Sequence, residues 1–357
     1  MSKPTNTFMR GRLEAATIKL SIVTKKSSFP GAYLFKGSTI SVAGNESQAM
    51  YDYGAEVDME EAVVPASAIA MFLRGDKDGT VTLHRSSPGR MVIESDNAKF
   101  QTSLLDPSSV TIPTITVDNW MGMDGWALGQ AMKDGGVWCG SHNIHNEYRH
   151  VQVSPVEGGL VVLSTNRSFL SAAFLKCDHS LGEAQFVPNP MVDLMAGASL
   201  KVEIAFSSSR VSFRSKEFVA HHSLCAEGRE VALPFITRAR TVPLAAIVDR
   251  RRLSELMAMA YSSSQDKVKT GIDVLVSEEG LVVTKTSSEN EFRASMPVEF
   301  KAGALWMCAS DNVSRTLDSM SCEKVEIRTT SDPADPVVIV PAGEEWPIHV
   351  ASKIRYA

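Results

Sequence analysis

Three short motifs in the last third of the chain carry the residue types of a serine acyl-transfer site. Ser264 and Lys267 stand in an SxxK arrangement, residues 269–271 read KTG, and residues 310–312 read SDN. In enzymes that use these motifs, SDN comes before KTG and the reactive serine opens a long buried helix. Here KTG precedes SDN, and Ser264 follows an apolar helical stretch. We therefore interpret the three motifs as a loop and a helix cap.

A second cluster has the residue types of a metal site. The stretch CGSHNIHNEYRH contains Cys139, His142, His145 and His150, and thiolate and imidazole groups are common ligands of Zn²⁺. The spacing matches no zinc pattern and no second ligand pair stands out, so we expect neither a metal nor a cofactor. The phosphate-binding GxxxxGK[ST], the dinucleotide-binding GxGxxG and the hydrolase GxSxG motifs are also missing. The sequence therefore indicates a protein that is not an enzyme.

The composition is typical of a soluble protein of the cytoplasm with several domains. With 357 residues and a hydrophobic fraction of 44%, the chain is long enough for two or three domains. The net charge of −5 argues against a surface coated in basic residues but allows a local basic surface. Five widely spaced cysteines without a CxxC pair are typical of a reducing compartment. We find no signal peptide and no apolar run long enough to cross a bilayer.

Two independent sets of similar segments divide the chain into three repeats. The first set, GSTISVAGNES, GGLVVLSTNRS and EGLVVTKTSSE, places Ile40, Val161 and Val282 in equivalent positions at intervals of 121 residues. The second set, TVTLHRSSPGRMVIES, LKVEIAFSSSRVSFRS and EKVEIRTTSDPADPVVIV, is anchored at Val81, Val202 and Val325. Because both sets keep nearly the same spacing, a chance likeness between unrelated hairpins is a poor explanation.

Each repeat predicts the same order of elements, namely a helix, alternating strands, a short second helix and more strands. The expected first helices are residues 12–26, 124–138 and 249–261. The expected second helices are residues 64–75, 188–197 and 310–321, the last N-capped by Ser310 or Asp311. The fold class is therefore α+β. Connectors near Ile115 and Pro234 give domains of residues 1–115, 116–234 and 235–357.

The chain ends in an alternating segment that predicts a strand. Ile348, Val350, Ile354 and Tyr356 are apolar at alternate positions, and only Ser352 interrupts the series. Chain ends are usually frayed and polar. An apolar end therefore suggests that this strand completes a sheet, contributes to a binding surface, or does both.

Three repeats of about 120 residues, with this order of elements, resemble the bacterial β sliding clamp, the β subunit of DNA polymerase III. The resemblance covers essentially the whole chain and rests on residues 63–105, 160–174, 310–327 and 336–356, together with the repeat and the length. It implies three clamp-type domains, each with two short helices packed on antiparallel sheets. It further implies a head-to-tail homodimer whose six domains form a ring around double-stranded DNA. The implied partners are the replicative DNA polymerase, the clamp loader and other clamp-binding peptides, at the cytoplasmic nucleoid.

Such a ring must hold DNA and still move along it. Its contacts should therefore go to phosphates, which carry no sequence information, and not to base edges. We expect Lys and Arg side chains on the helices that line the hole. The candidates are Lys19, Lys25, Lys26, Arg74, Lys133, Arg250, Arg251, Arg252 and Arg315. The second helix of the middle repeat carries no Lys or Arg, so the middle repeat supplies the fewest candidates.

The resemblance also implies a peptide-binding pocket between the second and third domains, with the end of the chain as one wall. A shallow apolar groove with a few polar groups suits an extended peptide. The positions that correspond are Tyr148, Thr165, Arg167, Leu170, Pro234, Arg238, Ala239, Val350, Ser352, Ile354, Arg355 and Tyr356. The apolar final strand can serve the pocket and the sheet together, because alternate side chains face opposite ways.

The chain departs from the clamp pattern at this pocket. The Gly-His pair of the family's TDGHRL segment is replaced by Arg167 and Ser168, and its arginine by Phe169. The usual Met-Pro-Met ending is replaced by residues 352–354, which read SKI, and Ala357 is an extra residue. We expect a more cationic pocket that prefers a different partner motif, with an added acidic residue.

Two other functions stay open on the sequence. One is a serine acyl-enzyme of the penicillin-binding type that uses Ser264 and Lys267, which a fluorescent penicillin would label. The other is a repeat scaffold that binds peptides without encircling DNA. A clamp differs from both because it stays on closed circular DNA and is lost after linearisation. Its ring also requires about twice the chain mass of 38.7 kDa.

Overall fold

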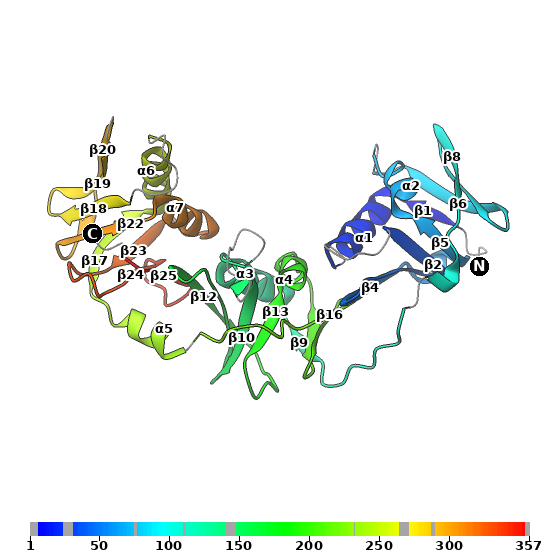
Figure 1. Ribbon diagram of the computed structural model, residues 1–357, viewed down its shortest axis with the longest axis horizontal. Helices are drawn as coiled ribbons and strands as arrows, with labels where there is room; N and C mark the ends of the chain where they lie inside the picture. Colours follow the sequence, from blue (N-terminus) through cyan, green and yellow to red (C-terminus); the bar gives the residue numbers. More distant parts are fainter. Residues whose placement is uncertain are drawn as a thin grey trace. The chain divides into compact units, whose positions relative to one another are not determined.

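The same order of elements occurs three times along the chain (Figure 1). The computed structural model describes residues 6–23, 31–74, 77–109, 112–139, 148–231, 233–263, 271–286 and 290–353. Within these residues, each repeat consists of a strand, a helix, a group of middle strands, a second helix and three final strands. Figure 1 labels these elements along the colour gradient from the first repeat to the last.

The bounds of the elements follow this order. The first repeat comprises β1 (Thr7–Met9), α1 (Arg10–Val23), β2 (Ala32–Gly37), β3 (Thr39–Ala43), β4 (Ser47–Asp52), η1 (Gly54–Glu56), β5 (Met59–Pro65), α2 (Ala66–Ala70), β6 (Thr80–Ser87), β7 (Arg90–Ser95) and β8 (Ala98–Ser103), with η2 (Pro107–Ser109) after it. The second comprises β9 (Met121–Met123), α3 (Gly125–Gly135), β10 (His150–Val156), β11 (Gly159–Thr165), β12 (Phe169–Lys176), β13 (Gln185–Pro188), α4 (Asn189–Ala196), β14 (Val202–Phe206), β15 (Arg210–Arg214) and β16 (Phe218–Ser223), with α5 (Leu233–Arg240) after it. The third comprises β17 (Leu244–Asp249), α6 (Arg250–Ser262), β18 (Ile272–Ser277), β19 (Gly280–Thr286), β20 (Glu291–Met296), β21 (Glu299–Phe300), β22 (Ala304–Cys308), α7 (Ser310–Ser319), β23 (Lys324–Arg328), β24 (Val337–Pro341) and β25 (Ile348–Ala351).

The described strands form four antiparallel sheets, two of which join successive repeats. In each repeat the first strand pairs with the first of the final three strands. The middle strands pair with one another, except β21, which pairs with β17. The eight-stranded sheet has the order β5-β2-β3-β4-β16-β15-β14-β9, so β4 of the first repeat pairs with β16 of the second. The nine-stranded sheet has the order β13-β10-β11-β12-β25-β24-β23-β17-β21, so β12 pairs with β25 in the same manner. The sheets β1-β6-β7-β8 and β20-β19-β18-β22 contain four strands each.

One anchor of the sequence repeat is confirmed by strand pairing. Val81, Val202 and Val325 all lie on the strand that pairs with the first strand of their repeat, and all are buried. Their partners are Phe8, Met123 and Val248, respectively. Each of these partners stands two residues before the first helix of its repeat. The second set of segments therefore aligns the three repeats correctly.

The other anchor is wrong by one residue in the first repeat. The hairpin turns end at Thr39, Gly159 and Gly280, which pair across them with Lys36, Val156 and Ser277. Counted from these turns, Ile40 corresponds to Leu160 and Leu281, not to Val161 and Val282. A shift of one residue exchanges the two faces of a strand. All three corresponding side chains, at positions 40, 160 and 281, are fully buried.

The chain forms two compact units, which are residues 1–126 with 190–224 and residues 127–189 with 225–357. The first unit contains the eight-stranded sheet and the second contains the nine-stranded sheet. Each sheet is continuous across the junction of two repeats, because its strands satisfy their backbone hydrogen bonds there. Compactness therefore divides the middle repeat. The three-domain division with boundaries near Ile115 and Pro234 stays a prediction about units of sequence.

Each large sheet has a helix face and a connector face. In the first unit, Tyr51 and Phe218 face α1, since the Lys19 ammonium lies 6.0 and 5.8 Å from their ring centroids. Met50 and Val219, the paired residues beside them, face the connector formed by residues 112–120. This alternation places α1 and the connector on opposite faces of the sheet.

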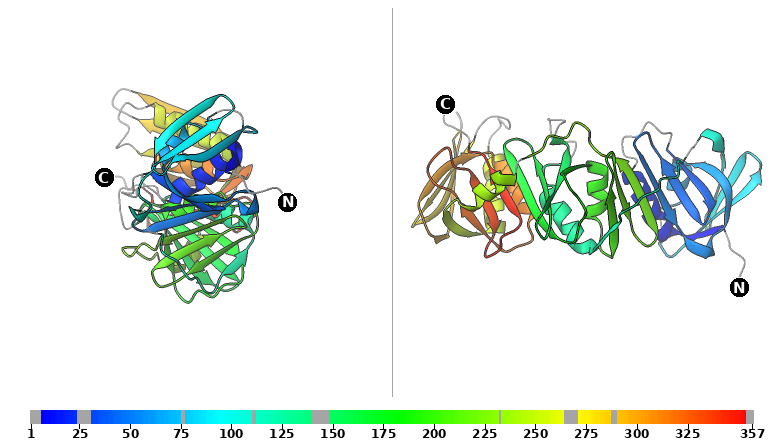
Figure 2. Two further views of the ribbon diagram at one scale, coloured as in Figure 1. Left: turned by 90° about the vertical axis from the view of Figure 1, so that its right-hand side faces the viewer. Right: turned by 90° about the horizontal axis from the view of Figure 1, so that it is seen from below.

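The second unit is organised in the same way. Phe169 and Ala351 belong to a core cluster with Leu253 and Leu256 of α6 and with Leu317 of α7. Their sequence neighbours Leu170 and Val350 belong to a separate cluster with Ile236 and Ala239 of α5. Helix α5 is drawn below β24 and β25 in Figure 1. In the right view of Figure 2, which is seen from below, it lies in front of these red strands. In the described part of the chain, no helix is long and apolar enough to span a membrane.

Apart from shifts of one to three residues at helix ends, such as the start of α1 and the end of α3, the helices differ from the sequence predictions in three places. Helix α2 ends at Ala70, where tighter bonds from Phe72 N to Ile69 O and from Leu73 N to Ala70 O close it. Helix α7 begins at Ser310 with Ala309 as its N-cap residue, so the expected caps stand in its first turn. The connector after the second repeat contains α5, which was not expected. Its proline near the N-terminus and its basic residues in the last turn favour a helix.

Candidate peptide and nucleic-acid interfaces

The motifs of acyl transfer and metal binding lie largely outside the described residues. These include Ser264, Lys267, His142 and His145. Residues 310–312 form the first turn of α7. Within the described residues, no group of three or more His, Cys, Asp or Glu side chains could hold a metal ion.

The described cysteine and histidine of that metal cluster are packing residues. Cys139 is buried, and its Sγ lies 3.6 Å from the Arg149 carbonyl oxygen. His150 is buried beside Phe186 with ring centroids 4.8 Å apart, and this burial lowers its pKa to about 4. The imidazole is therefore neutral at physiological pH.

Two Ser–His pairs lie inside the large sheets. His349 Nδ1 is 2.7 Å from the Ser171 hydroxyl, and His221 Nδ1 is 2.8 Å from the Ser212 hydroxyl. Burial lowers the pKa of His349 to about 3. Burial and the nearby Arg210 charge lower the pKa of His221 to about 4. Ser171 and His349 are 0% and 2% exposed, so a substrate does not reach them and the pair cross-links β12 to β25.

The basic residues predicted for DNA contact divide into three groups. Lys19 of α1, Lys133 of α3 and Arg315 of α7 are exposed on helices. The Arg315 guanidinium lies 5.7 Å from the Trp138 ring centroid, a cation–π distance that leaves its outer face toward solvent. Arg251 and Arg252 are exposed at the start of α6, and each lies 3.4 Å from Glu255. Exposed pairs of this kind are weak and do not prevent a contact with phosphate.

The remaining candidates do not share this arrangement. Arg250 is half-buried, and its guanidinium donates to the carbonyl oxygens of Leu317 and Cys322 at 2.9 and 2.7 Å. A cation in this position caps the C-terminal end of α7, so we assign Arg250 a structural role. Arg74 is exposed but lies four residues beyond the end of α2, so its placement on a helix was wrong. Lys25 and Lys26 lie outside the described residues.

The residues predicted for the peptide pocket gather on the connector face of the nine-stranded sheet. Leu170, Ala239 and Val350 belong to one apolar cluster and are 5%, 0% and 3% exposed. Leu170 pairs with Val350 on one side and with Thr165 on the other. These side chains pack α5 onto the sheet, and Pro234 and Arg238 are exposed on α5 beside them.

The tip of the β11–β12 hairpin carries the polar part of this surface. Arg167 has a positive φ of 76°, and its amide donates to Thr165 Oγ1 at 3.1 Å. Its guanidinium lies 5.6 Å from the Tyr148 ring centroid. The Ser352 amide donates to the Ser168 carbonyl oxygen at 2.8 Å, which joins the final strand to the hairpin. Ile354, Arg355 and Tyr356 lie outside the described residues.

A neighbouring cavity of about 210 Å³ was not predicted from the sequence. Val338, Val340 and Ile348 line it together with Arg240 and Arg328. Beside it, the Arg240 guanidinium lies 4.3 Å from the Trp346 ring centroid. The continuous apolar run PVVIVP indicates a strand buried on both faces, but the sequence gives no sign of the cavity beside it.

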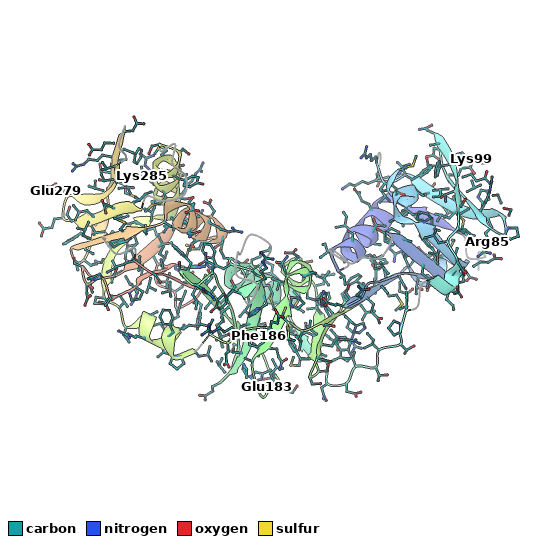
Figure 3. The ribbon with its side chains drawn as sticks, in the orientation of Figure 1. Arg85, Lys99, Glu183, Phe186, Glu279 and Lys285 are labelled. Atoms are coloured by element: carbon teal, nitrogen blue, oxygen red, sulfur yellow. The ribbon has the colours of Figure 1, made fainter. Side chains whose placement is uncertain are left out.

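The free edges of the four-stranded sheets follow from the same pairing rule. At both described junctions, the third middle strand of one repeat pairs with the last strand of the next, as β4 with β16 and β12 with β25. The corresponding strands that are left are β20 in the third repeat and β8 in the first. Both are end strands of their sheets in the chain. Lys99, labelled in Figure 3, lies on β8.

These features together define the fold of a DNA sliding clamp. No known protein family matches the chain by sequence, and no curated protein does either. A putative DNA polymerase III β subunit from Eubacterium rectale has a TM-score of 0.83 at 13% identity, covering 98% of this chain and 99% of that one. A sliding clamp from Pseudomonas aeruginosa, solved bound to griselimycin, has a TM-score of 0.83 at 15% identity, covering 99% and 100%. The β subunit from Streptococcus pyogenes has a TM-score of 0.83 at 13% identity, covering 98% and 99%. These likenesses establish the fold, and the low identities mark the chain as divergent in sequence.

Proposed function

We propose that the chain is a non-enzymatic DNA sliding clamp that works as a head-to-tail homodimer. The observation that carries this proposal is the pairing rule, which joins each repeat to the next by one defined pair of strands. Applied between chains, the rule pairs β20 of one copy with β8 of the other. Each chain has one free edge of each kind, so two copies close a ring of six repeats.

The side chains on the two free edges are compatible with this pairing. Phe100 on β8 and Phe292 and Ala294 on β20 are half-buried apolar residues. The pairing of β4 with β16 and the pairing of β12 with β25 each define a possible register for β8 with β20. These two registers differ by two residues. Both registers place Phe100 on the same face as Phe292 and Ala294, because a shift of two residues preserves the face. The union would complete an apolar layer already begun by Phe292 and Ala294 on the core of the third repeat.

The basic residues on the helix faces supply a surface for duplex DNA. We propose phosphate contacts from Lys19, Lys133, Arg251, Arg252 and Arg315, with Arg74, Lys25 and Lys26 as further candidates. Helices present the first five of these residues as separate points of charge on long side chains, without a fixed recognition surface for base edges. Sequence-independent contacts of this kind hold DNA loosely and allow the protein to slide. The net charge of −5 keeps the rest of the surface repulsive to nucleic acid.

The connector face of the second unit supplies the partner site. We propose that extended peptides of the replicative polymerase, the clamp loader and other DNA-bound proteins bind on this face beside α5, at the edge of the buried cluster of Leu170, Ala239 and Val350, in a cytoplasmic complex at the nucleoid. The side chains available to hold them are Thr165, Arg167, Pro234, Arg238 and Ser352, with Tyr148, Ile354, Arg355 and Tyr356. Arg167 and Arg238 favour a peptide that carries an acidic residue.

Retention on circular DNA tests the clamp. The chain is loaded by its host's clamp loader onto a nicked circular plasmid, which is then isolated by gel filtration. A ring held by topology stays with the circle at high salt and leaves after a restriction enzyme linearises it. Loss at the same rate from both forms would replace the proposal with ordinary DNA binding or with a peptide scaffold.

A further inference from the structure

The first unit contains a groove that none of the predicted sites uses. A cavity of about 570 Å³ lies between the connector face of the eight-stranded sheet and residues 112–120. Met50 and Val219, paired across β4 and β16, form its floor. Ile112 and Ile115 of the connector form its roof, and Trp120 closes one end. We call this cavity the connector groove.

The connector groove lies over the junction of β4 with β16, which corresponds to the junction of β12 with β25 that α5 covers in the second unit. There, Ile236 and Ala239 of α5 fill the space over β12 and β25 and are 4% and 0% exposed. In the first unit, residues 112–120 of the connector contain no helix, and Figure 1 shows them as an extended trace. The space filled by helical side chains in one unit is therefore left open in the other. Met50 remains 38% exposed on its floor.

The connector offers hydrogen-bonding groups to an added strand. Residues 114–119 make no hydrogen bond with the backbone of another described residue. The Gln48 side-chain amide donates to the Pro113 carbonyl oxygen at 3.1 Å, which holds the start of the connector to the sheet. Unpaired backbone along an extended segment is a template for a strand from another protein.

The charge of the lining selects the kind of peptide. None of the described residues that line the groove is acidic. Arg214 lies at the Trp120 end, with its guanidinium 4.3 Å from the indole ring centroid. Its Nε and Nη2 donate to Glu203 at 2.5 and 2.8 Å, which fixes the group and partly offsets its charge. Arg210 adds a second positive charge four residues away on the same face of β15. A carboxylate is therefore favoured at this end, and a cation is disfavoured.

We propose that the connector groove is a second docking site, which takes an extended segment of a partner protein with apolar residues and an acidic residue at alternate positions. The apolar side chains would lie between Met50, Val219 and Ile115, and the carboxylate would lie near Arg214. Alternate positions are required because they share one face of an extended strand. This site is independent of the pocket proposed in the second unit and needs neither DNA nor a closed ring.

Two labelled peptides test the proposal by fluorescence anisotropy. The first, acetyl-SVTLSEG-amide, presents Val, Leu and Glu on one face, and the second, acetyl-SVTLSKG-amide, replaces Glu by Lys. We expect the first to bind about twofold to fivefold more tightly at low salt, as one exposed ion pair allows, with the difference fading at high salt. Met50→Asp should weaken the first peptide by about tenfold or more, because it puts an unpaired carboxylate on the apolar floor.

Matched variants separate this site from a folding defect and from the second unit. Met71→Asp adds the same charge at another exposed methionine of the first unit and should leave binding unchanged, as should Met50→Leu. Arg238→Glu, on α5, should also leave it unchanged. Equal binding by native chain and Met50→Asp, equal binding of both peptides at low salt, or no binding at 1 mM would overturn the proposal. Dissociation of a native dimer by Met50→Asp would also overturn it, by showing that a second copy covers the groove.

Discussion

The strongest test of the ring is a charge placed on its free edge. Phe100 lies on β8, is half-buried within the chain, and shares a face with Phe292 and Ala294 across the proposed junction. In Phe100→Asp, the burial lost at each junction costs about 1 kcal/mol, roughly half the value for a fully buried phenylalanine. An unpaired carboxylate against an apolar surface costs about 2 kcal/mol more.

The ring contains this junction twice, so the cost doubles to about 6 kcal/mol for the dimer, which raises its dissociation constant by about four orders of magnitude. We expect native chain to be dimeric and Phe100→Asp to be monomeric in analytical ultracentrifugation at micromolar concentration. Because the changed residue lies on an edge strand, the monomer should keep its circular dichroism spectrum.

Two further variants control this experiment. Phe292→Asp, on β20, should have the same effect, because it changes the other side of the same junction. Leu200→Asp adds the same charge to a residue of the first unit that is already 76% exposed, and it should remain dimeric. A Phe100→Asp chain that dimerises as tightly as the native chain would refute the pairing of β8 with β20.

Three other predictions follow from local structure. Burial lowers the pKa of His349 to about 3, whereas an unfolded histidine titrates near 6.5. The contribution of the neutral His349 to stability is therefore complete above pH 6.5. It is lost as the pH falls toward 3, by about 1.4 kcal/mol per pH unit. His349→Gln should therefore flatten the fall in urea-unfolding free energy between pH 6.5 and 4, and an unchanged slope would contradict this. A Cβ at Gly135 would lie 2.3 Å from the Val162 carbonyl oxygen, so Gly135→Ala should lower the unfolding free energy by about 1–3 kcal/mol. Gly122→Ala is the control, because a Cβ at Gly122 meets open space and should leave the unfolding free energy almost unchanged. Lys133→Ala should reduce the salt dependence of DNA affinity by about 0.9 in log–log slope if the residue contacts one phosphate, a change that a titration with short duplex DNA would reveal.

The site was only partly predictable for physical reasons that particular residues illustrate. The alternation of residues 348–351 predicted β25, and its pairing with β12 and β24 shows that this strand completes a sheet. The exposure of Lys19, Lys133 and Arg315 on helices could be predicted, because charged side chains usually stay in contact with water. Arg250 looks the same in sequence, yet its guanidinium caps α7 from a distant part of the chain. Sequence spacing contains no information about such a contact.

The repeat, the class of its elements and the lack of a recognisable catalytic motif can be read from the sequence, because they depend on local periodicity and residue type. The strands that join the repeats and the edges that stay free cannot, because they depend on pairings between strands more than 160 residues apart, such as β4 with β16. The tertiary structure also decided that one connector is filled by α5 and the other is open over a groove. A helical connector and an extended connector can both bury apolar side chains over this sheet surface. The sequences of the two short connectors therefore do not specify which of the two conformations each adopts.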